Sequence, residues 1–275
     1  MPYQSELGMY FKFIFLVFST LFLLACSKNE QKHEIPIIAH AASGLFNPQR
    51  FYKDNTLEAI EYALNFKELD GIEVDVQVSA DGTLWLYHDE FLESQTNAEG
   101  EICLLKDNYL ENVYYRSLNN EKLARLIDVN FSKISGEKII FLDFKFNYGC
   151  DFSKIHLGKL IKQIDIIKNN KLTIIPVLSA PEQIEYFKQK GFESIYLDVP
   201  NITKAKDIST QYLVEGVFIR NANVTKSDVQ YLQSTSQLKV VIFDVRTSLS
   251  IRNALIKSPD FLMVEEFKTA LLEVK

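Results

Sequence analysis

The segment Asp70-Gly-Ile-Glu-Val-Asp-Val-Gln-Val-Ser-Ala-Asp-Gly-Thr-Leu-Trp-Leu-Tyr-His-Asp89 decides the fold. Its first part, Gly71–Val76, is rich in β-branched and aliphatic residues, which predicts a buried strand. Asp81-Gly82 then lies between two apolar runs, a strong signal for a hairpin turn. The four residues before Thr83 leave no room for a crossover helix. We therefore expect Val76–His88 to form a hairpin at the end of the strand, not a further strand of the main sheet.

Elsewhere the chain alternates short apolar runs with amphipathic segments, a pattern that predicts parallel strands joined by helices. One amphipathic segment, Asn55–Asn65, has Asn55 in a capping position and Glu58 in the capping-box position of a helix. The expected strands are Ile35–Ala39, Gly71–Val76, Lys138–Phe144, Leu172–Leu178, Ser194–Val199, Gly216–Ile219, Lys239–Asp244 and Asp260–Val264. Eight strands in about 240 residues predict an α/β protein with a single (β/α)8 TIM barrel and a hairpin excursion after strand 2.

The beginning of the chain differs from the rest in composition. Phe13–Leu24 is an apolar run that is short for a membrane span and typical of a secretory signal. It ends in Leu23-Leu24-Ala25-Cys26, which resembles a bacterial lipobox and implies cleavage before Cys26 and lipidation of that residue. We expect residues 1–26 to be a lipoprotein signal peptide, 27–34 a polar tether and 35–275 the barrel. The exported protein would be lipid-anchored to a bacterial membrane on the periplasmic or cell-surface side. The alternatives are an ordinary membrane anchor and a cysteine that stands there by chance.

The composition of the chain limits the classes of partner that we expect it to bind. The net charge of −6 gives no electrostatic footprint for nucleic acid. Hydrophobic residues make up 47% of the chain, ample for one large core. Cys103 and Cys150 could form a disulfide in an oxidising compartment, or remain two separate thiols.

Paired carboxylates mark the expected site. Glu73 and Asp75 are two residues apart on one strand, so their side chains point to the same face. Both faces of a barrel strand are covered, one by helices and one by the interior, so this acidic face cannot simply be solvated. Two carboxylates in one cavity are costly unless a cation neutralises them. Oxygen ligands favour a hard ion, and the sequence predicts one divalent cation, Ca²⁺ or Mg²⁺.

Further ionisable residues end neighbouring strands. His40 ends the first strand, and Asp143 and Lys145 end the third, where active-site residues of barrels lie. With a two-residue turn at Asp81-Gly82, His88 would pair directly opposite Asp75. A register error of one residue would turn it to the other face.

These residues carry a resemblance to a known family. Ile38-Ala-His40, Asn55-Thr-Leu-Glu-Ala59, the Asp70–Val76 run, Asp81-Gly82 and His88-Asp89 are similar in order and spacing to the glycerophosphodiester phosphodiesterase family of phospholipase C-like barrels. The match is strong over 35–89, fair over 142–145 and weak beyond. The resemblance implies that Glu73, Asp75 and Asp143 are metal ligands, that His40 and His88 are catalytic, and that Lys145 binds the substrate phosphate.

The chain departs from the family at Ala41, where an arginine usually helps to hold the phosphate. Arg50 or Lys53 could reach the site instead. Asp143 stands where the family usually has a glutamate, so the side chain is one methylene shorter. The flexible coordination of Ca²⁺ tolerates this change better than that of Mg²⁺.

The implied reaction is metal-dependent hydrolysis of a glycerophosphodiester to glycerol phosphate and an alcohol. A lysophospholipid or sphingolipid phosphodiesterase of the same fold, and a catalytically impaired binding lipoprotein, are the alternatives. The leaving alcohol, the metal, the histidine that starts as base and the oligomeric state stay open.

Overall fold

A computed structural model describes residues 35–146, 150, 157–167 and 171–274. Residues 35–274 form one compact unit. The predicted signal peptide, Cys26 and the tether lie outside the described residues, so the lipid anchor remains a prediction. Within the described part of the chain, no helix is long and apolar enough to cross a membrane.

Parallel strands close into a TIM barrel, as predicted. Each strand pairs with its sequential barrel neighbour, and β1 pairs with both β10 and β2, which completes the ring. The barrel strands are β1 (Ile37–Ala39), β2 (Gly71–Val78), β5 (Lys138–Phe144), β6 (Leu172–Leu178), β7 (Tyr196–Val199), β8 (Gly216–Arg220), β9 (Lys239–Val245) and β10 (Phe261–Val264). Their bounds lie within two residues of the predicted ones at every end.

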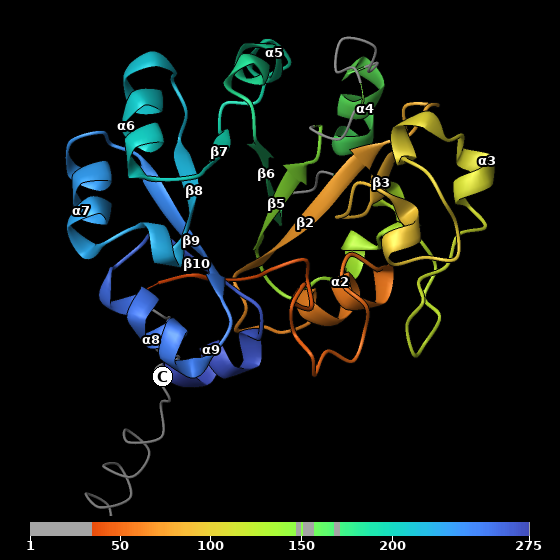
Figure 1. The fold of residues 1–275 in the computed structure, drawn as a ribbon, viewed down its shortest axis with the longest axis horizontal. Helices are drawn as coiled ribbons and strands as arrows, with labels where there is room; N and C mark the ends of the chain where they lie inside the picture. The colour runs from red at the N-terminus through yellow and green to blue at the C-terminus, as the bar shows by residue number, and fades with distance from the viewer. Residues whose placement is uncertain (1–34, 147–149, 151–156, 168–170, 275) are drawn as a thin grey trace, which may run out of the picture. The chain divides into compact units, whose positions relative to one another are not determined.

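Helices surround the strands (Figure 1). They are α2 (Leu57–Leu64), α4 (Leu157–Ile167), α5 (Ile184–Gln189), α6 (Ile202–Gln211), α7 (Lys226–Ser234), α8 (Ser248–Ile256) and α9 (Phe267–Glu273). The predicted cap of α2 was wrong by one residue. Thr56 is the N-cap and accepts a hydrogen bond from Ala59 N, whereas Asn55 adopts φ = 56° and is free to bond elsewhere.

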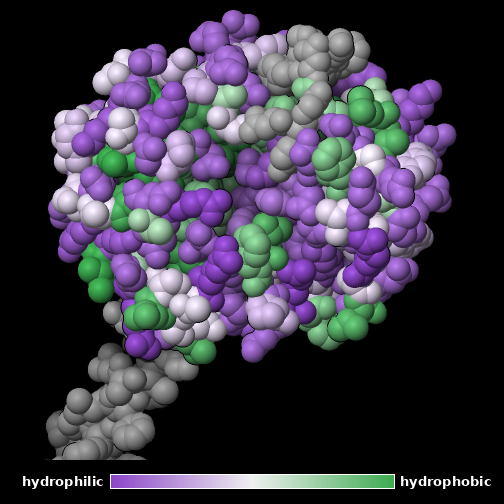
Figure 2. Space-filling model, viewed as in Figure 1, coloured by the Kyte–Doolittle hydropathy of each residue, from purple (hydrophilic) through white to green (hydrophobic). Residues whose placement is uncertain are grey.

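Two apolar layers hold the barrel together. One fills its interior and includes Ile38, Phe141, Tyr196, Phe218 and Met263, with ring pairs among the aromatic members. The larger layer lies between strands and helices. The surface on the side of Figure 1 mixes hydrophilic and hydrophobic side chains, with mostly hydrophilic ones around a central hollow (Figure 2).

The excursion after β2 is a small substructure of its own. It contains β3 (Leu84–Leu86), α3 (Asp107–Leu110) and β4 (Ala124–Arg125), with antiparallel pairing of β2 to β3 and of β3 to β4. Its separate core is built around side chains that include Trp85, Tyr87 and Tyr115.

The hairpin itself was predicted correctly, but its register was not. Val76 pairs with Leu86 and Val78 with Leu84, and Ser79 N bonds Thr83 O, so three residues form the loop. Gly82, at φ = 86°, takes the left-handed position that ends such three-residue loops. Asp75 therefore lies opposite Tyr87, whose N–H donates to Asp75 O, and not opposite His88.

Cys103 and Cys150 form a disulfide, with their Cα atoms 6.1 Å apart. This resolves the alternative that composition left open. The bond ties the excursion to the segment that follows β5.

Candidate active site

The alternation of side chains along barrel strands explains why the polar residues meet. Ile38, Phe141 and Met263 point into the barrel interior. Two residues further along each of these strands, at or just beyond the strand end, lie His40, Asp143 and Glu265. Because successive side chains alternate across a strand, these three polar groups face the same mouth above the apolar interior.

Three carboxylates gather at this mouth. β2 supplies Glu73 and Asp75, which are buried, and β5 supplies Asp143 directly beside Asp75 in the parallel register. One carboxylate oxygen from each lies within 4.8 Å of the others. Glu73 Oε1 is buried without a hydrogen-bond partner, which is costly unless a cation is bound there. Three converging oxygens fit a hard divalent ion, which binds oxygen at roughly 2.0–2.6 Å.

Lys145 lies among these acids. Its Nζ is 2.5 Å from Asp143 Oδ2 and 3.0 Å from Asp75 Oδ1. Burial favours protonated Asp75, but Lys145 and the two histidines outweigh it and lower the pKa of Asp75 to about 2. Glu73 has no lysine so close, and burial together with the charge of Asp75 raises its pKa. Ionising Glu73 beside Asp75 is therefore costly, and a bound divalent cation would offset that cost.

His40 is held between two acidic groups. Its Nδ1 lies 2.7 Å from Glu265 Oε1 and its Nε2 lies 3.8 Å from Glu73 Oε2. Burial of the ring opposes protonation, but the hydrogen bond to Glu265 and the charges of Glu73, Glu265 and Asp75 raise the pKa of His40 to about 9. The residue after it, Ala41, donates its backbone N–H to Glu73 Oε2 at 2.9 Å.

His88 lies near the charged groups of the mouth, although the register predicted for it was wrong. β3 ends at Leu86, so His88 lies beyond the paired residues. Burial and the charge of Lys145 lower the pKa of His88, but the charge of Asp75 and a hydrogen bond to Asp89 outweigh them and raise it. His88 Nδ1 is 2.8 Å from Asp89 Oδ1. The charge of Asp75 thus acts on His88, although the two residues are not cross-strand partners.

Two residues of this site were missed in the sequence. Asn55 donates to Asp75 Oδ2 at 2.7 Å and accepts from Asp75 N at 2.9 Å, so it fixes the carboxylate. Glu265, 2% exposed, bonds His40 and also accepts from Phe46 N at 2.9 Å. Counting in twos along the last strand would have turned Glu265 to the mouth. The role of Asn55 was missed because Asn55 was predicted to cap α2, a role that Thr56 takes in the structure.

A cavity of about 650 Å³ adjoins the site. Ser94 and Gln95 line it and also bond Asp89, the partner of His88. The exposed apolar side chains at this cavity are Phe46, Phe51 and Leu118.

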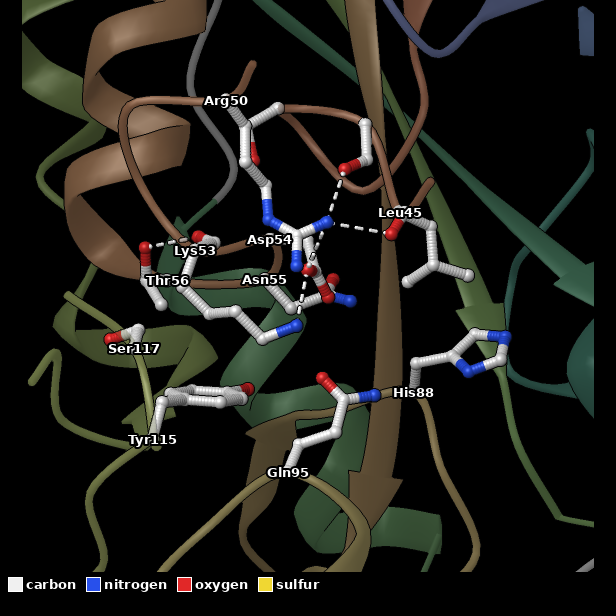
Figure 3. Close-up of polar contacts among 12 residues, drawn as sticks. Leu45, Arg50, Lys53, Asp54, Asn55, Thr56, His88, Gln95, Tyr115 and Ser117 are labelled. Atoms are coloured by element: carbon white, nitrogen blue, oxygen red, sulfur yellow. Dashed lines mark hydrogen bonds and ion pairs between the residues drawn. The ribbon is translucent and has the colours of Figure 1, made fainter. Parts of the chain in front are cut away.

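Arg50 and Lys53, considered as substitutes for the missing arginine, line the same cavity. Figure 3 shows both side chains converging on Asp54. Arg50 Nη1 lies 3.3 Å and Lys53 Nζ 2.5 Å from Asp54 Oδ1. Arg50 also donates to the carbonyls of Gly44 and Leu45, and the Lys53 ammonium lies 5.5 Å from the centre of the Tyr115 ring. Both cations are therefore already paired in this structure, and their contact with a phosphate stays a prediction.

Comparisons with known proteins agree with this geometry. Residues 40–207 match the glycerophosphoryl diester phosphodiesterase family. A glycerophosphodiester phosphodiesterase from Bacillus altitudinis is 48% identical over 56 residues, which are 20% of this chain and only 21% of that protein.

Solved structures share the fold. A phosphodiesterase from Oleispira antarctica, in complex with the product sn-glycerol-3-phosphate, superposes with a TM-score of 0.72 at 16% identity, covering 87% of this chain and 96% of that one. The glycerophosphodiester phosphodiesterase from Thermotoga maritima gives 0.64 at 19%, covering 87% and 97%. With the family match extending over more than half of its length, this chain belongs to the glycerophosphoryl diester phosphodiesterase family.

Proposed function

We propose that this protein is a metal-dependent phosphodiesterase that hydrolyses glycerophosphodiesters to glycerol phosphate and an alcohol. One observation carries the proposal: three carboxylates converge within 4.8 Å at a barrel mouth that also holds two histidines, each with a carboxylate on Nδ1. Family membership and the fold shared with phosphodiesterase structures support it.

Glu73, Asp75 and Asp143 would hold the cation, with Asn55 fixing Asp75. Bound there, a divalent ion would supply charge neutralisation for a phosphate and its transition state. Ca²⁺ and Mg²⁺ both suit this oxygen set, and the shorter Asp143 favours Ca²⁺. Lys145, already among the acids, would add a positive charge against a phosphate oxygen.

His40 and His88 would divide the proton transfers. One accepts the proton of the attacking hydroxyl, from the glycerol or from water, as its oxygen bonds to phosphorus. The other donates a proton to the alcohol oxygen as the phosphorus–oxygen bond to the leaving group breaks. When the attacking group is the neighbouring glycerol hydroxyl, water then opens the cyclic phosphate with the two roles exchanged.

A second substrate class has an observation in its favour. Phe51 is 73% exposed and Leu118 fully exposed, and both line the cavity that also contains Ser94 and Gln95, the partners of Asp89. Such side chains suit an alkyl chain better than a small polar alcohol, which favours a lysophospholipid as the second candidate.

A substrate panel separates the two. Purified protein with Ca²⁺ or Mg²⁺ is incubated with short glycerophosphodiesters and with lysolipids, and the released glycerol phosphate or alcohol is measured. We expect glycerophosphodiesters to be cleaved with the higher kcat/KM. A preference for lysolipids that falls on Phe51→Ser and Leu118→Ser would replace the first candidate by the second. No cleavage of any substrate would reject the proposal in favour of a binding protein.

We further propose that the protein is exported and attached to a bacterial membrane through a lipid on Cys26. The support is the apolar run followed by Leu23-Leu24-Ala25-Cys26. Replacing Cys26 by serine should release the protein from the membrane fraction or block its processing. A Cys26→Ser protein that fractionates and migrates as the wild type does would reject the anchor.

A further inference from the structure

Glu265 is a buried carboxylate with two partners, one on each oxygen. Oε1 lies 2.7 Å from His40 Nδ1, and Oε2 accepts the backbone N–H of Phe46 at 2.9 Å. It follows β10 directly, on the side of the barrel where β10 pairs with β1. Its main chain is fixed as well, because Glu265 N donates to Val245 O.

The loop after His40 closes tightly over this residue. Gly44 has φ = 89°, and a Cβ at that position would lie 2.1 Å from Glu265 O. Gly44 N also donates to His40 O at 2.7 Å. Loop and carboxylate therefore leave the His40 ring little freedom, and the ring edge carrying Nε2 is turned toward Glu73.

We infer that Glu265 is a positioning residue that sets the tautomer of His40: the Nδ1–H is kept toward Glu265, and the Nε2 lone pair of the neutral ring is presented to the substrate. This inference rests on the proposed role of His40 in proton transfer. A carboxylate on the far nitrogen of an imidazole fixes both its orientation and its tautomer, and such partners matter strongly for catalysis.

A glutamine at position 265 should do more harm than an alanine. The Phe46 N–H can only donate, so the single oxygen of a glutamine satisfies it and the amide NH₂ then faces His40 Nδ1. His40 must accept from that NH₂, which places its own proton on Nε2, where the substrate would need a lone pair. Alanine leaves Nδ1 without a protein partner and imposes neither tautomer.

The test compares Glu265→Gln, Glu265→Ala and the control Glu266→Gln. Glu266 is the adjacent carboxylate, which caps α9 and touches neither histidine in the described structure. We expect kcat to fall by roughly 10²–10⁴-fold in Glu265→Gln and by less in Glu265→Ala, with KM little changed and the control near wild type. A residue needed only for folding would give the opposite order, because glutamine preserves the packing better. Glu265→Ala equal to or worse than Glu265→Gln would overturn the inference.

A spectroscopic readout is independent of turnover. The chain has four histidines, so ¹⁵N–¹H spectra of the metal-loaded protein, assigned with His40→Gln, can report the neutral ring of His40 directly. The wild type should show the Nδ1–H tautomer, and Glu265→Gln the Nε2–H tautomer. An Nε2–H wild type would overturn the inference even in a fully active enzyme. A wild type with the Nδ1–H form but no turnover would instead reject the proposed function alone.

Discussion

The barrel mouth presents two histidine–carboxylate pairs that differ in their surroundings. His40 and Glu265 lie at the ends of β1 and β10, and their side chains are 13% and 2% exposed. His88 and Asp89 lie on the excursion, at 29% and 28%. The first pair is set by barrel strands and a tight loop, and the second by the polar side chains of Ser94 and Gln95. Because the first pair is buried, the hydrogen bond at His40 Nδ1 depends on Glu265 alone. The second pair is more exposed, so water can replace part of its hydrogen bonding.

The largest expected effects come from removing the rings themselves. His40→Ala and His88→Ala should each lower kcat by roughly 10²–10⁴-fold while fold and metal binding persist. A diester with a nitrophenol leaving group, which needs no proton on departure, should restore one variant and not the other, and so identify the acid. His33→Ala is the control, as a histidine of the predicted tether. Two variants that retain more than a tenth of wild-type activity would remove both histidines from the mechanism.

A smaller effect is expected on the stability of the metal-free protein. The pKa of His40 rises from 6.5 to about 9 on folding, so its protonated form stabilises the native state. That contribution, up to about 3 kcal/mol, is complete below pH 6.5 and disappears as the pH rises to 9.

Urea unfolding with chelator at pH 6 and pH 9.5 measures this difference. In His40→Gln, most of the difference in unfolding free energy between pH 6 and pH 9.5 should disappear. His88, whose pKa is also raised, should account for part of the difference that remains. An unchanged pH dependence in His40→Gln would mean that the ring is not paired with Glu265 in solution.

The smallest effect is expected at Asp89. Asp89→Asn should lower kcat by roughly 10–100-fold, less than Glu265→Gln, because its more exposed site admits water. Glu90→Gln, at the exposed neighbouring position, serves as the control. An Asp89→Asn defect larger than that of Glu265→Gln would reverse the comparison and make the excursion the more stringent side of the site.

The two sides also differ in how far sequence could predict them. Barrel strands, and the mouth positions of His40, Glu73, Asp75 and Asp143, followed from apolar runs and two-residue alternation, which local chemistry determines. Glu265 could not be paired with His40 in this way, because their contact depends on closing the barrel across 225 residues.

On the excursion, the limit was the turn. Asp81-Gly82 suits both a two-residue and a three-residue loop, and only the left-handed Gly82 at the end of a three-residue loop decides the register. The error named His88 as the cross-strand partner of Asp75, whereas the observed partner is Tyr87. His88 stays at the mouth because β3 ends two residues before it, so the pairing rule that was applied to it does not extend that far.

Metal dependence is the most direct test of the central claim, that three carboxylates form a catalytic cation site. Chelator-treated wild type should show no cleavage of a glycerophosphodiester, and titration with Ca²⁺ or Mg²⁺ should restore it saturably, with binding measured in parallel by calorimetry. Asp75→Asn should lose both binding and activity, while Asp128→Asn, a surface carboxylate paired with Arg125, should match the wild type. Full activity of the wild type in chelator, or wild-type metal binding by Asp75→Asn, would contradict the account.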